Sequence, residues 1–372
     1  MRHPDVIVIG AGIVGAACAH ALANAGLSVL VLDARLGGAT NAGMGHLVVM
    51  DDNPAELALS QASLAQWHAW APRMAAEAPG TAFSHCGTLW IAADADEMAE
   101  AEHKRERLVA HGVGCELIGA RALAALEPVL RPGLHGALRV GGDAMVYAPN
   151  TAKWLLDHAA RPIEVEALRA SRIAGRSVHC SDGSVREGGA LLLAAGIHAA
   201  QFCPELPIRP KKGHLAITDR GSASVRHQLV ELGYVKNAHQ SEGSSVAFNL
   251  QPRPTGQWLL GSSRQFDTLD PAVDNAVLAR MLRRALEYVP SLAERNAIRT
   301  WTGFRAATPD GLPIIGRHPV HEHLWLAVGH EGLGVTTAPA TASLVAAGML
   351  GAAAAIDPSP YLPTRFAQEH AP

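Results

Sequence analysis

Short, unbroken runs of apolar residues mark the N-terminal part of the chain, and glycines or an acid bound them. Residues 6–9 (VIVI) and 28–33 (SVLVLD) form two such runs. Continuous apolar runs of this length are typical of strands buried on both faces of a parallel sheet. The small residues between Gly10 and Gly26 favour a helix that joins the two runs. The pattern therefore predicts a β-α-β unit near the N-terminus.

Farther along, helical and strand patterns alternate in blocks. Helical spacing recurs in residues 54–80, 94–111, 150–159 and 271–288. Strand patterns recur in residues 85–92, 163–167, 177–181, 190–196, 214–218, 246–250, 258–261 and 324–328. The blocks predict an α/β protein in which a Rossmann-type domain is interleaved with an α+β domain built on a largely antiparallel sheet. We expect the first domain in residues 1–80, 148–206 and 300–372, and the second in residues 81–147 and 207–299.

Composition narrows the class of protein. The 372 residues are 48% hydrophobic and 17% charged with a net charge of -3, so charge gives no argument for nucleic acid or anionic lipid. The five cysteines form no C-x-x-C pair and no H-E-x-x-H occurs, so we expect no disulfide framework and no metal. The apolar run at 6–9 is too short for an export signal. We expect a cytoplasmic protein.

A long uncharged segment near the C-terminus raises the question of a membrane span. No charged residue occurs from Gly332 until Asp357. However, Thr336, Thr337 and Pro339 lie in its first half, and a proline is tolerated in the first turn of a helix. The segment is therefore expected to start a buried helix rather than to cross a membrane.

The N-terminal unit carries a dinucleotide-binding pattern. Gly10, Gly12 and Gly15 form G-x-G-x-x-G around Ile13 and Val14, and Asp33 ends the second strand before Ala34. The glycines permit a tight turn, close approach of a pyrophosphate and close packing of the helix, while the acid can bind ribose hydroxyls. The alternative is a glycine-rich turn that binds nothing. A second small-residue loop, residues 37–46, suits contact with a flat ligand, or is a flexible surface loop.

At this point the chain resembles the D-amino-acid oxidase superfamily of flavoproteins, in its glycine oxidase and sarcosine oxidase branch. The resemblance extends over essentially the whole chain and rests on VIVIGAGIVG at 6–15, LD at 32–33, GGATNAGM at 37–44, GTLWIA at 87–92, LEP at 126–128, LLLAAG at 191–196, PKKGH at 210–214, LLGSS at 259–263, TGFRAATPDGLPIIG at 302–316 and VGHEGLGVTTAPAT at 328–341. It implies an FAD-binding domain and a substrate domain.

The resemblance also implies which residues border FAD. The expected set is Gly10, Gly12, Ile13, Val14, Gly15, Asp33, Ala34, Thr40, Asn41, Ala42, Gly43, Met44, Gly45, Ala170, Ala195, Gly196, Gly303, Gly329, Gly332, Leu333, Gly334 and Val335. Ala170 enters by spacing alone, as a backbone contact to adenine from a strand pair near 163–173. No cysteine occurs in residues 329–334, so the cofactor is expected to be non-covalent.

The implied chemistry is oxidation of a carbon–nitrogen bond beside a carboxylate, by hydride transfer to flavin N5. Arg305 matches the arginine that binds the substrate carboxylate in this branch, and its alternative role is a structural salt bridge. Asn249 stands where the branch has a tyrosine three residues before a proline. His46 and His330 could line the substrate side, or could be positioning or structural residues.

Several functions remain open on the sequence. The first is an FAD-dependent oxidase or dehydrogenase of a small amino or imino acid, such as a D-amino acid, an N-methyl amino acid or D-hydroxyproline, in amino acid catabolism. The others are a 2-hydroxy-acid oxidoreductase and a flavin subunit of a hetero-oligomeric amino-acid dehydrogenase, which could itself be non-catalytic. Oxygen or an electron-transfer partner could accept the electrons, and a homo- or hetero-oligomer is possible.

Overall fold

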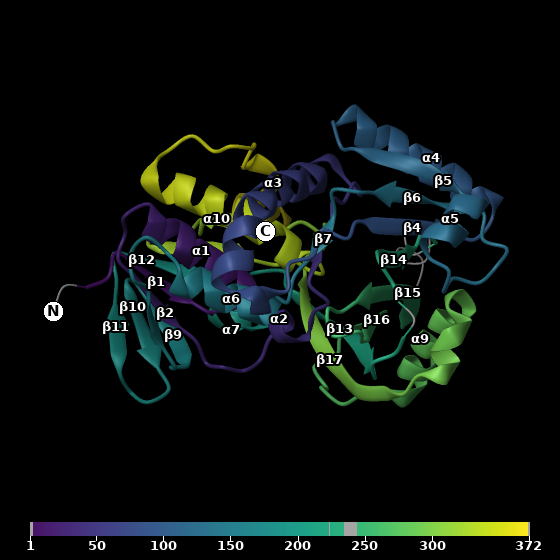
Figure 1. Ribbon diagram of the computed structural model, residues 1–372. Coiled ribbons are helices and arrows are strands. Elements are labelled where there is room, and N and C mark those ends of the chain that lie inside the picture. The colour runs from purple at the N-terminus through teal and green to yellow at the C-terminus, as the bar shows by residue number, and fades with distance from the viewer. Residues whose placement is uncertain (1–2, 223, 234–243, 371–372) are drawn as a thin grey trace. The chain divides into compact units, whose positions relative to one another are not determined.

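The chain divides into two compact units, each assembled from separate segments. The computed structural model describes residues 3–222, 224–233 and 244–370 (Figure 1). Unit 1 comprises Met1–Phe83, Val146–Pro210 and Arg305–Pro372, and unit 2 comprises Ser84–Met145 and Lys211–Phe304. The domain boundaries expected from the sequence fall between residues 80/81, 147/148, 206/207 and 299/300. The boundaries between the two units of the structure fall between residues 83/84, 145/146, 210/211 and 304/305.

Unit 1 is built on a six-stranded sheet in the order β18-β19-β12-β1-β2-β8. Its strands are β1 (Val6–Ile9), β2 (Val29–Leu32), β8 (Glu164–Glu166), β12 (Ala190–Leu193), β18 (Ile314–Arg317) and β19 (Leu324–Val328). Only β18 runs antiparallel to its neighbour within this sheet, and the other neighbouring pairs are parallel. A separate three-stranded antiparallel sheet contains β9 (Ala170–Ala174), β10 (Ser177–Cys180) and β11 (Val185–Glu187).

The helices of unit 1 cluster around α1. They are α1 (Ile13–Asn24), α2 (Ala39–Ala42), α3 (Pro54–Glu77), α6 (Ala148–Asp157), α7 (Ala199–Phe202) and α10 (Gly334–Leu350). Helix α1 packs against α10 and α6, and α10 also packs against α3 (Figure 1). All but three of the twelve residues of α1 are buried, since it lies between these helices and the sheet. Close packing on every side explains its small, apolar sequence.

Helix α10 contains Pro339, and side chains of α3 bond the backbone next to it. Proline has no N–H and disturbs the hydrogen-bond ladder of a helix interior. Trp67 Nε1 donates to Thr336 O at 2.9 Å, and Ser63 Oγ accepts from Ala340 N at 3.1 Å. Both α3 side chains are fully buried. These bonds satisfy polar groups that would otherwise be costly to bury.

An aromatic layer joins α1, α3 and α6. The rings of Trp67 and Trp70 meet edge to face with centroids 5.3 Å apart, and Trp70 and Trp154 do so at 6.0 Å. His20 of α1 lies against both Trp70 and Trp154. Edge-to-face pairs at these distances are favourable beyond the area that they bury.

Unit 2 is built on an eight-stranded sheet in the order β17-β13-β16-β15-β14-β4-β6-β5. Its strands are β4 (Thr88–Ala92), β5 (Cys115–Gly119), β6 (Gly136–Val140), β13 (Arg209–Thr218), β14 (Gln228–Glu231), β15 (Ser245–Pro252), β16 (Trp258–Phe266) and β17 (Ala297–Ala307), and the two-residue β7 (Ala144–Met145) also belongs to this unit. Its helices are α4 (Ala95–Ala110), α5 (Ala120–Leu126) and α9 (Asn275–Tyr288). From β13 to β5 the neighbouring strands pair antiparallel, except that β14 and β4 are parallel.

A buried ionic network ties α9 to the sheet of unit 2. Glu231 of β14 is fully buried and accepts from Phe248 N, from Arg284 and from Tyr288 Oη. The rings of Tyr288 and Phe248 are stacked at 4.6 Å. Because a buried carboxylate is costly unless it is paired and hydrogen-bonded, these partners explain why the charge is tolerated here.

The α/β class expected from the sequence is confirmed, and most of the expected elements are present. Strands β1 and β19 have the predicted bounds. The segment near 163–173 is not one strand pair, because β8 joins the six-stranded sheet and β9 the three-stranded one. Elements β5, α5, β6 and β14 were not predicted. Among the described residues, no helix has the length and apolar character that a membrane span requires.

Candidate active site

Four strands of unit 1 deliver the expected cofactor residues to one edge of the sheet. Strand β1 ends before Gly10, β2 before Asp33, β12 before Ala194 and β19 before Gly329. These strands are parallel neighbours, so their carboxyl ends meet at the same edge. Ligands of open α/β sheets bind at this edge. The structure therefore brings together the glycine-rich turn, the acid and the loop before α10.

Packing requires glycine at two positions of the G-x-G-x-x-G turn. Gly10 has φ +108°, and a Cβ there would lie 2.6 Å from Ala194 O. A Cβ at Gly15 would lie 2.0 Å from Gly10 O. Ala194 N also donates to Ile9 O at 2.9 Å, and Ala195 and Gly196 follow directly. The end of β12 is thus pressed against the turn, which matches the roles predicted for these glycines.

Asp33 is held by backbone donors on both sides. Its Oδ2 accepts from Ala11 N at 2.7 Å, and its Oδ1 accepts from Arg35 N at 2.7 Å. Asp33 N in turn donates to Glu166 O at the end of β8. Because an ionised carboxylate has about four acceptor positions, capacity for ribose hydroxyls remains. Sequence reasoning did not identify Glu166, whose carbonyl orients this acid.

The second small-residue loop meets the start of α1. Thr40 of α2 accepts from Ile13 N through Oγ1 at 2.9 Å, and its hydroxyl is the nearest atom to a Cβ built at Gly12, at 3.2 Å. Asn41 and Gly43 are exposed, and Ala42, Met44 and Gly45 are buried. Gly45 has φ +84° and abuts Val146 O. The loop therefore lies beside the glycine-rich turn within unit 1, and its contact with the flavin stays a prediction.

The loop before α10 brings a second helix start to the same place. Gly329 has φ +76°, and Glu331 has φ +47° and donates its N–H to Ala306 O at 2.9 Å. A Cβ at Gly334 would lie 3.8 Å from Val14 Cγ2 of α1. Neither Gly12 nor Leu333 caps its helix through a side chain. The partial positive charges of two helix N-termini thus converge, which suits an anionic ligand. Val335 is half-buried in the first turn of α10.

His330 is enclosed under α10. Its Nε2 lies 3.0 Å from Thr341 Oγ1, and the side chain is 8% exposed. Burial lowers the pKa of His330 to about 3, so the imidazole is neutral at physiological pH. Neutral histidine buried in this way is poorly suited to act as a general acid.

His46 lies on β3 (His46–Leu47), next to α10. Its carbonyl accepts from Thr336 Oγ1 at 2.9 Å, and its side chain is half-buried. Thr336 Oγ1 also lies 3.4 Å from Val48 N. This backbone tie positions the second small-residue loop against the first turn of α10.

Arg305 lies at the start of the last segment of unit 1, beside the loop before α10. A Cβ at Gly332 would be 3.6 Å from Arg305 Nε and 3.7 Å from its Cδ. The neighbouring carbonyl of Ala306 holds Glu331 N. Arg305 is therefore a half-buried residue that lies alongside Gly332, in the part of unit 1 that carries the expected flavin loop.

Asn249 and Gly303 belong to unit 2. Asn249 is half-buried on β15, opposite Val230 and Gly261. Its neighbours Phe248 and Leu250 point into the core of unit 2, so Asn249 points to the opposite face of the sheet. Gly303 lies on β17 close to Arg305 in sequence. Their roles stay predictions.

Ala170 is the weakest of the expected cofactor residues. It pairs with Cys180 at the start of β9 and packs on the core formed by β1, β2 and β12. The residue that the structure places beside Asp33 is Glu166 at the end of β8. An adenine contact from Ala170 stays a prediction.

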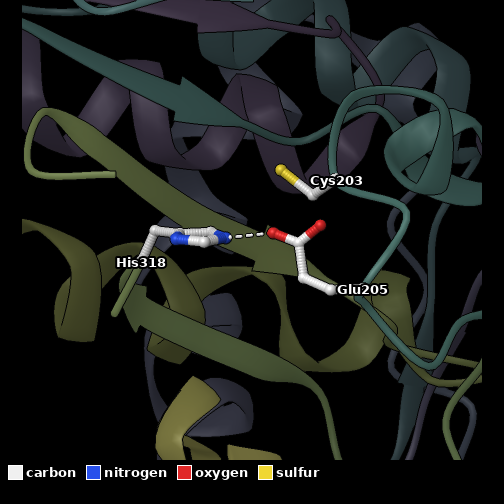
Figure 2. Close-up of side chains that lie close together, drawn as sticks. All are labelled: Cys203, Glu205 and His318. Carbon is white, nitrogen blue, oxygen red and sulfur yellow. Dashed lines mark hydrogen bonds and ion pairs between the residues drawn. The ribbon is translucent and has the colours of Figure 1, made fainter. Parts of the chain in front are cut away.

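Cys203, Glu205 and His318 come close enough to hold a metal ion (Figure 2). His318 Nε2 lies 2.7 Å from Glu205 Oε1, while His318 Nδ1 accepts from the N–H groups of Val320 and His321. These donors fix the proton on Nε2, which donates to Glu205. A metal bound to Nε2 would move that proton to Nδ1, where it would face the N–H groups of Val320 and His321. A histidine that binds a metal normally donates a hydrogen bond from its other ring nitrogen to an acceptor. The hydrogen bonds therefore disfavour a metal at this cluster.

The fold and this site define a dinucleotide-binding α/β protein whose glycine-rich turn, acid and paired helix starts fit a flavin dinucleotide. Residues 5–348 match the model of a family described as FAD dependent oxidoreductase, and the chain belongs to that family. The protein is thus an FAD-dependent oxidoreductase, which confirms the superfamily, enzyme class and cofactor predicted from the sequence.

Individual relatives agree with this family over almost their full lengths. Glycine oxidase of Pseudomonas aeruginosa is 27% identical, covering 96% of this chain and 98% of the relative. The HcnC subunit of hydrogen cyanide synthase from the same species is 26% identical, covering 100% of this chain and 98% of the relative. The crystal structure of glycine oxidase from Geobacillus kaustophilus superimposes with a TM-score of 0.88 at 23% identity, covering 98% of this chain and 99% of that one.

Proposed function

We propose that this enzyme oxidises the C–N bond of a small amino or imino acid, with FAD as the bound cofactor. The observation that carries the proposal is Arg305 lying along Gly332 beside the start of α10. A planar guanidinium binds a carboxylate through two hydrogen bonds and fixes its orientation. An amino acid held by its carboxylate presents its α-carbon at a defined distance from that anchor. Relatives that include glycine oxidase support this substrate class.

The residues of unit 1 have distinct tasks in this chemistry. When bound, FAD would supply the two-electron acceptor for this oxidation. Gly10, Gly12, Gly15 and Asp33 would hold its adenosine diphosphate part at the carboxyl edge of the sheet. The start of α10 would stabilise negative charge that develops on the reduced ring system. The imine product then hydrolyses in water.

Neither histidine of the expected site needs to act as a base. The pKa of His330 is lowered to about 3 by burial, and its Nε2 is engaged with Thr341. His46 is fixed through its backbone carbonyl. Hydride transfer from an amine requires orientation of the α-carbon more than proton abstraction by the protein. We assign positioning roles to both residues, which follows one of the two alternatives left open by the sequence.

Finer properties remain predictions. FAD is expected to be non-covalent because residues 329–334 contain no cysteine. Oxygen or an electron-transfer partner accepts the electrons, and a hetero-oligomer has support from the HcnC subunit among the relatives. The cytoplasmic location expected from the sequence stays a prediction, which fractionation of cells would test.

Product analysis tests the proposed reaction. The FAD-loaded enzyme is given D-, L- and N-methyl amino acids, prolines and hydroxyprolines with oxygen or an artificial electron acceptor. Release of ammonia or an amine, or formation of a cyclic imine, supports the proposal. A keto acid formed only from 2-hydroxy acids, without nitrogen release, supports the 2-hydroxy-acid oxidoreductase instead. If the enzyme turns over neither class of substrate, the result supports a non-catalytic flavin subunit instead.

A further inference from the structure

We infer that His330 and Thr341 act as a coupled positioning pair that sets the first turn of α10 against the cofactor. This inference rests on the FAD function proposed above. It differs from a role of His330 in proton transfer, because the pair would act through the placement of a helix start. His330 contacts α10 at Gly334 and at Thr341.

His330 lies beneath the point where α10 begins. A Cβ built at Gly334 would lie 3.3 Å from His330 Cβ and 4.0 Å from its Cγ. His330 O also accepts from Leu333 N at 3.0 Å, and Leu333 O accepts from Thr337 N. The histidine therefore supports the turn that precedes the helix through both its backbone and its side chain. A smaller side chain would leave Gly334 without this contact.

The imidazole reaches from that turn to the second turn of the helix. His330 Nε2 lies 3.0 Å from Thr341 Oγ1, and Thr341 is fully buried. One side chain thus connects the residue before the helix with a residue two turns inside it. Losing one partner would leave the other polar group buried without its bond, which is more costly than losing both. The two residues should therefore be energetically coupled.

Other bonds hold the start of α10 through different residues. Trp67 and Ser63 hold Thr336 O and Ala340 N from α3, and Thr336 Oγ1 holds His46 O. These contacts come from the side of α10 that faces α3 and β3. His330 supplies the contact under Gly334, where Val14 of α1 also approaches. The pair would therefore set the spacing between the starts of α1 and α10.

Helix position matters because the field of a helix terminus falls off within about one turn. A displaced start of α10 should weaken binding of reduced, anionic FAD more than binding of oxidised FAD. The ratio of these two dissociation constants is thermodynamically equivalent to the shift of the midpoint potential of bound FAD from that of free FAD. It can be measured without any amino acid substrate. Failure of the proposed substrate class would leave this test unaffected.

The experiment compares His330→Phe, Thr341→Val, the double variant and Ser343→Ala. Ser343 is exposed on α10 and serves as the matched control. FAD affinity is measured by flavin fluorescence, and the midpoint potential by anaerobic dye titration. His330→Gln tests rescue by a side chain that keeps a polar terminus, and Thr341→Val provides a mild variant should His330→Phe fail to fold.

We expect each single variant to weaken oxidised FAD binding by about tenfold and reduced FAD binding more, which lowers the potential. The double variant should be no worse than either single variant, His330→Gln should recover part of the loss, and Ser343→Ala should match the parent. Unchanged potentials in the folded single variants would overturn the inference. Multiplicative effects in the double variant would do so as well, because they would mean that the residues act independently.

Discussion

The carboxylate of Asp33 at the end of β2 accepts a hydrogen bond from Ala11 N of the glycine-rich turn, at 2.7 Å. The acid that is expected to bind ribose therefore also shapes the turn that is expected to bind pyrophosphate. Two parts of the nucleotide site are linked through one side chain, so a change at Asp33 should affect both.

Asp33→Asn should weaken FAD binding by roughly tenfold to a hundredfold, since hydrogen bonds to a charged group contribute about 1.5–3 kcal/mol. Titration of apoprotein with FAD, followed by fluorescence, measures the change. Asp182→Asn is the control, because Asp182 also accepts from a backbone N–H two residues on, but in the β10–β11 turn. Equal affinity of the two variants would refute the role of Asp33.

Gly15→Ala should destabilise unit 1 by at least about 1–3 kcal/mol, the usual cost of overpacking. The added Cβ would meet Gly10 O at 2.0 Å, and backbone cannot yield as a flexible side chain can. Thermal unfolding of the apoprotein reports this cost without FAD. Gly38→Ala is the matched control, because none of the neighbouring atoms considered lies within 4 Å of a Cβ built at Gly38. A Gly15 variant as stable as the Gly38 variant would contradict the packing described for the turn.

The cofactor site predicted from the sequence rests on signals that are local. The G-x-G-x-x-G turn, Asp33 and the glycines before α10 each follow a strand that its apolar run identifies, and parallel strands bring their ends together. The bonds that position these residues were not predictable. Glu166, Trp67 and Ser63 reach their partners across long stretches of sequence, and no spacing rule connects them. Strand β14 was missed because it is only four residues long and carries Gln228 and Glu231, whose buried partners come from other elements.

Trp67→Phe should lower the free energy of unfolding by about 1–3 kcal/mol, because it removes the donor to Thr336 O and leaves that carbonyl buried. Trp70→Phe, on the same helix and within the same aromatic layer, should cost less, since the structure places it half-buried among rings. Denaturant titration of both variants measures the difference. A larger loss for Trp70→Phe would show that ring packing, rather than the bond to α10, dominates.

Stability should fall as pH decreases below about 6.5. Burial lowers the pKa of His330 to about 3, and burial also lowers the pKa values of His20 and His318. The unfolded chain therefore takes up protons first, and each such histidine can contribute up to about 1.4 kcal/mol per pH unit between its two pKa values. Their contribution is complete above pH 6.5 and is lost progressively as pH falls. Denaturant titrations between pH 8 and pH 5 should show this decline, with a shallower slope in His330→Phe; equal stability across that range would contradict it.

Arg305→Met should raise the KM for the substrate strongly, because it removes the proposed carboxylate partner. Loss of one member of a buried charge pair costs roughly 2–5 kcal/mol. Arg305→Lys keeps the charge but not the fork, so it should recover only part of the affinity. Steady-state kinetics and FAD titration together separate substrate binding from cofactor binding. An unchanged KM in Arg305→Met would assign Arg305 to a structural salt bridge instead.

Oxidation at a C–N bond is the central claim, and anaerobic reduction of the bound flavin by matched substrate pairs tests it most directly. Each pair contains an amino acid and the 2-hydroxy acid of the same carbon skeleton, such as glycine with glycolate and each enantiomer of alanine with that of lactate. The account predicts loss of the oxidised-flavin absorbance with the amino member of at least one pair and not with its hydroxy partner. Bleaching by the hydroxy members alone would contradict it.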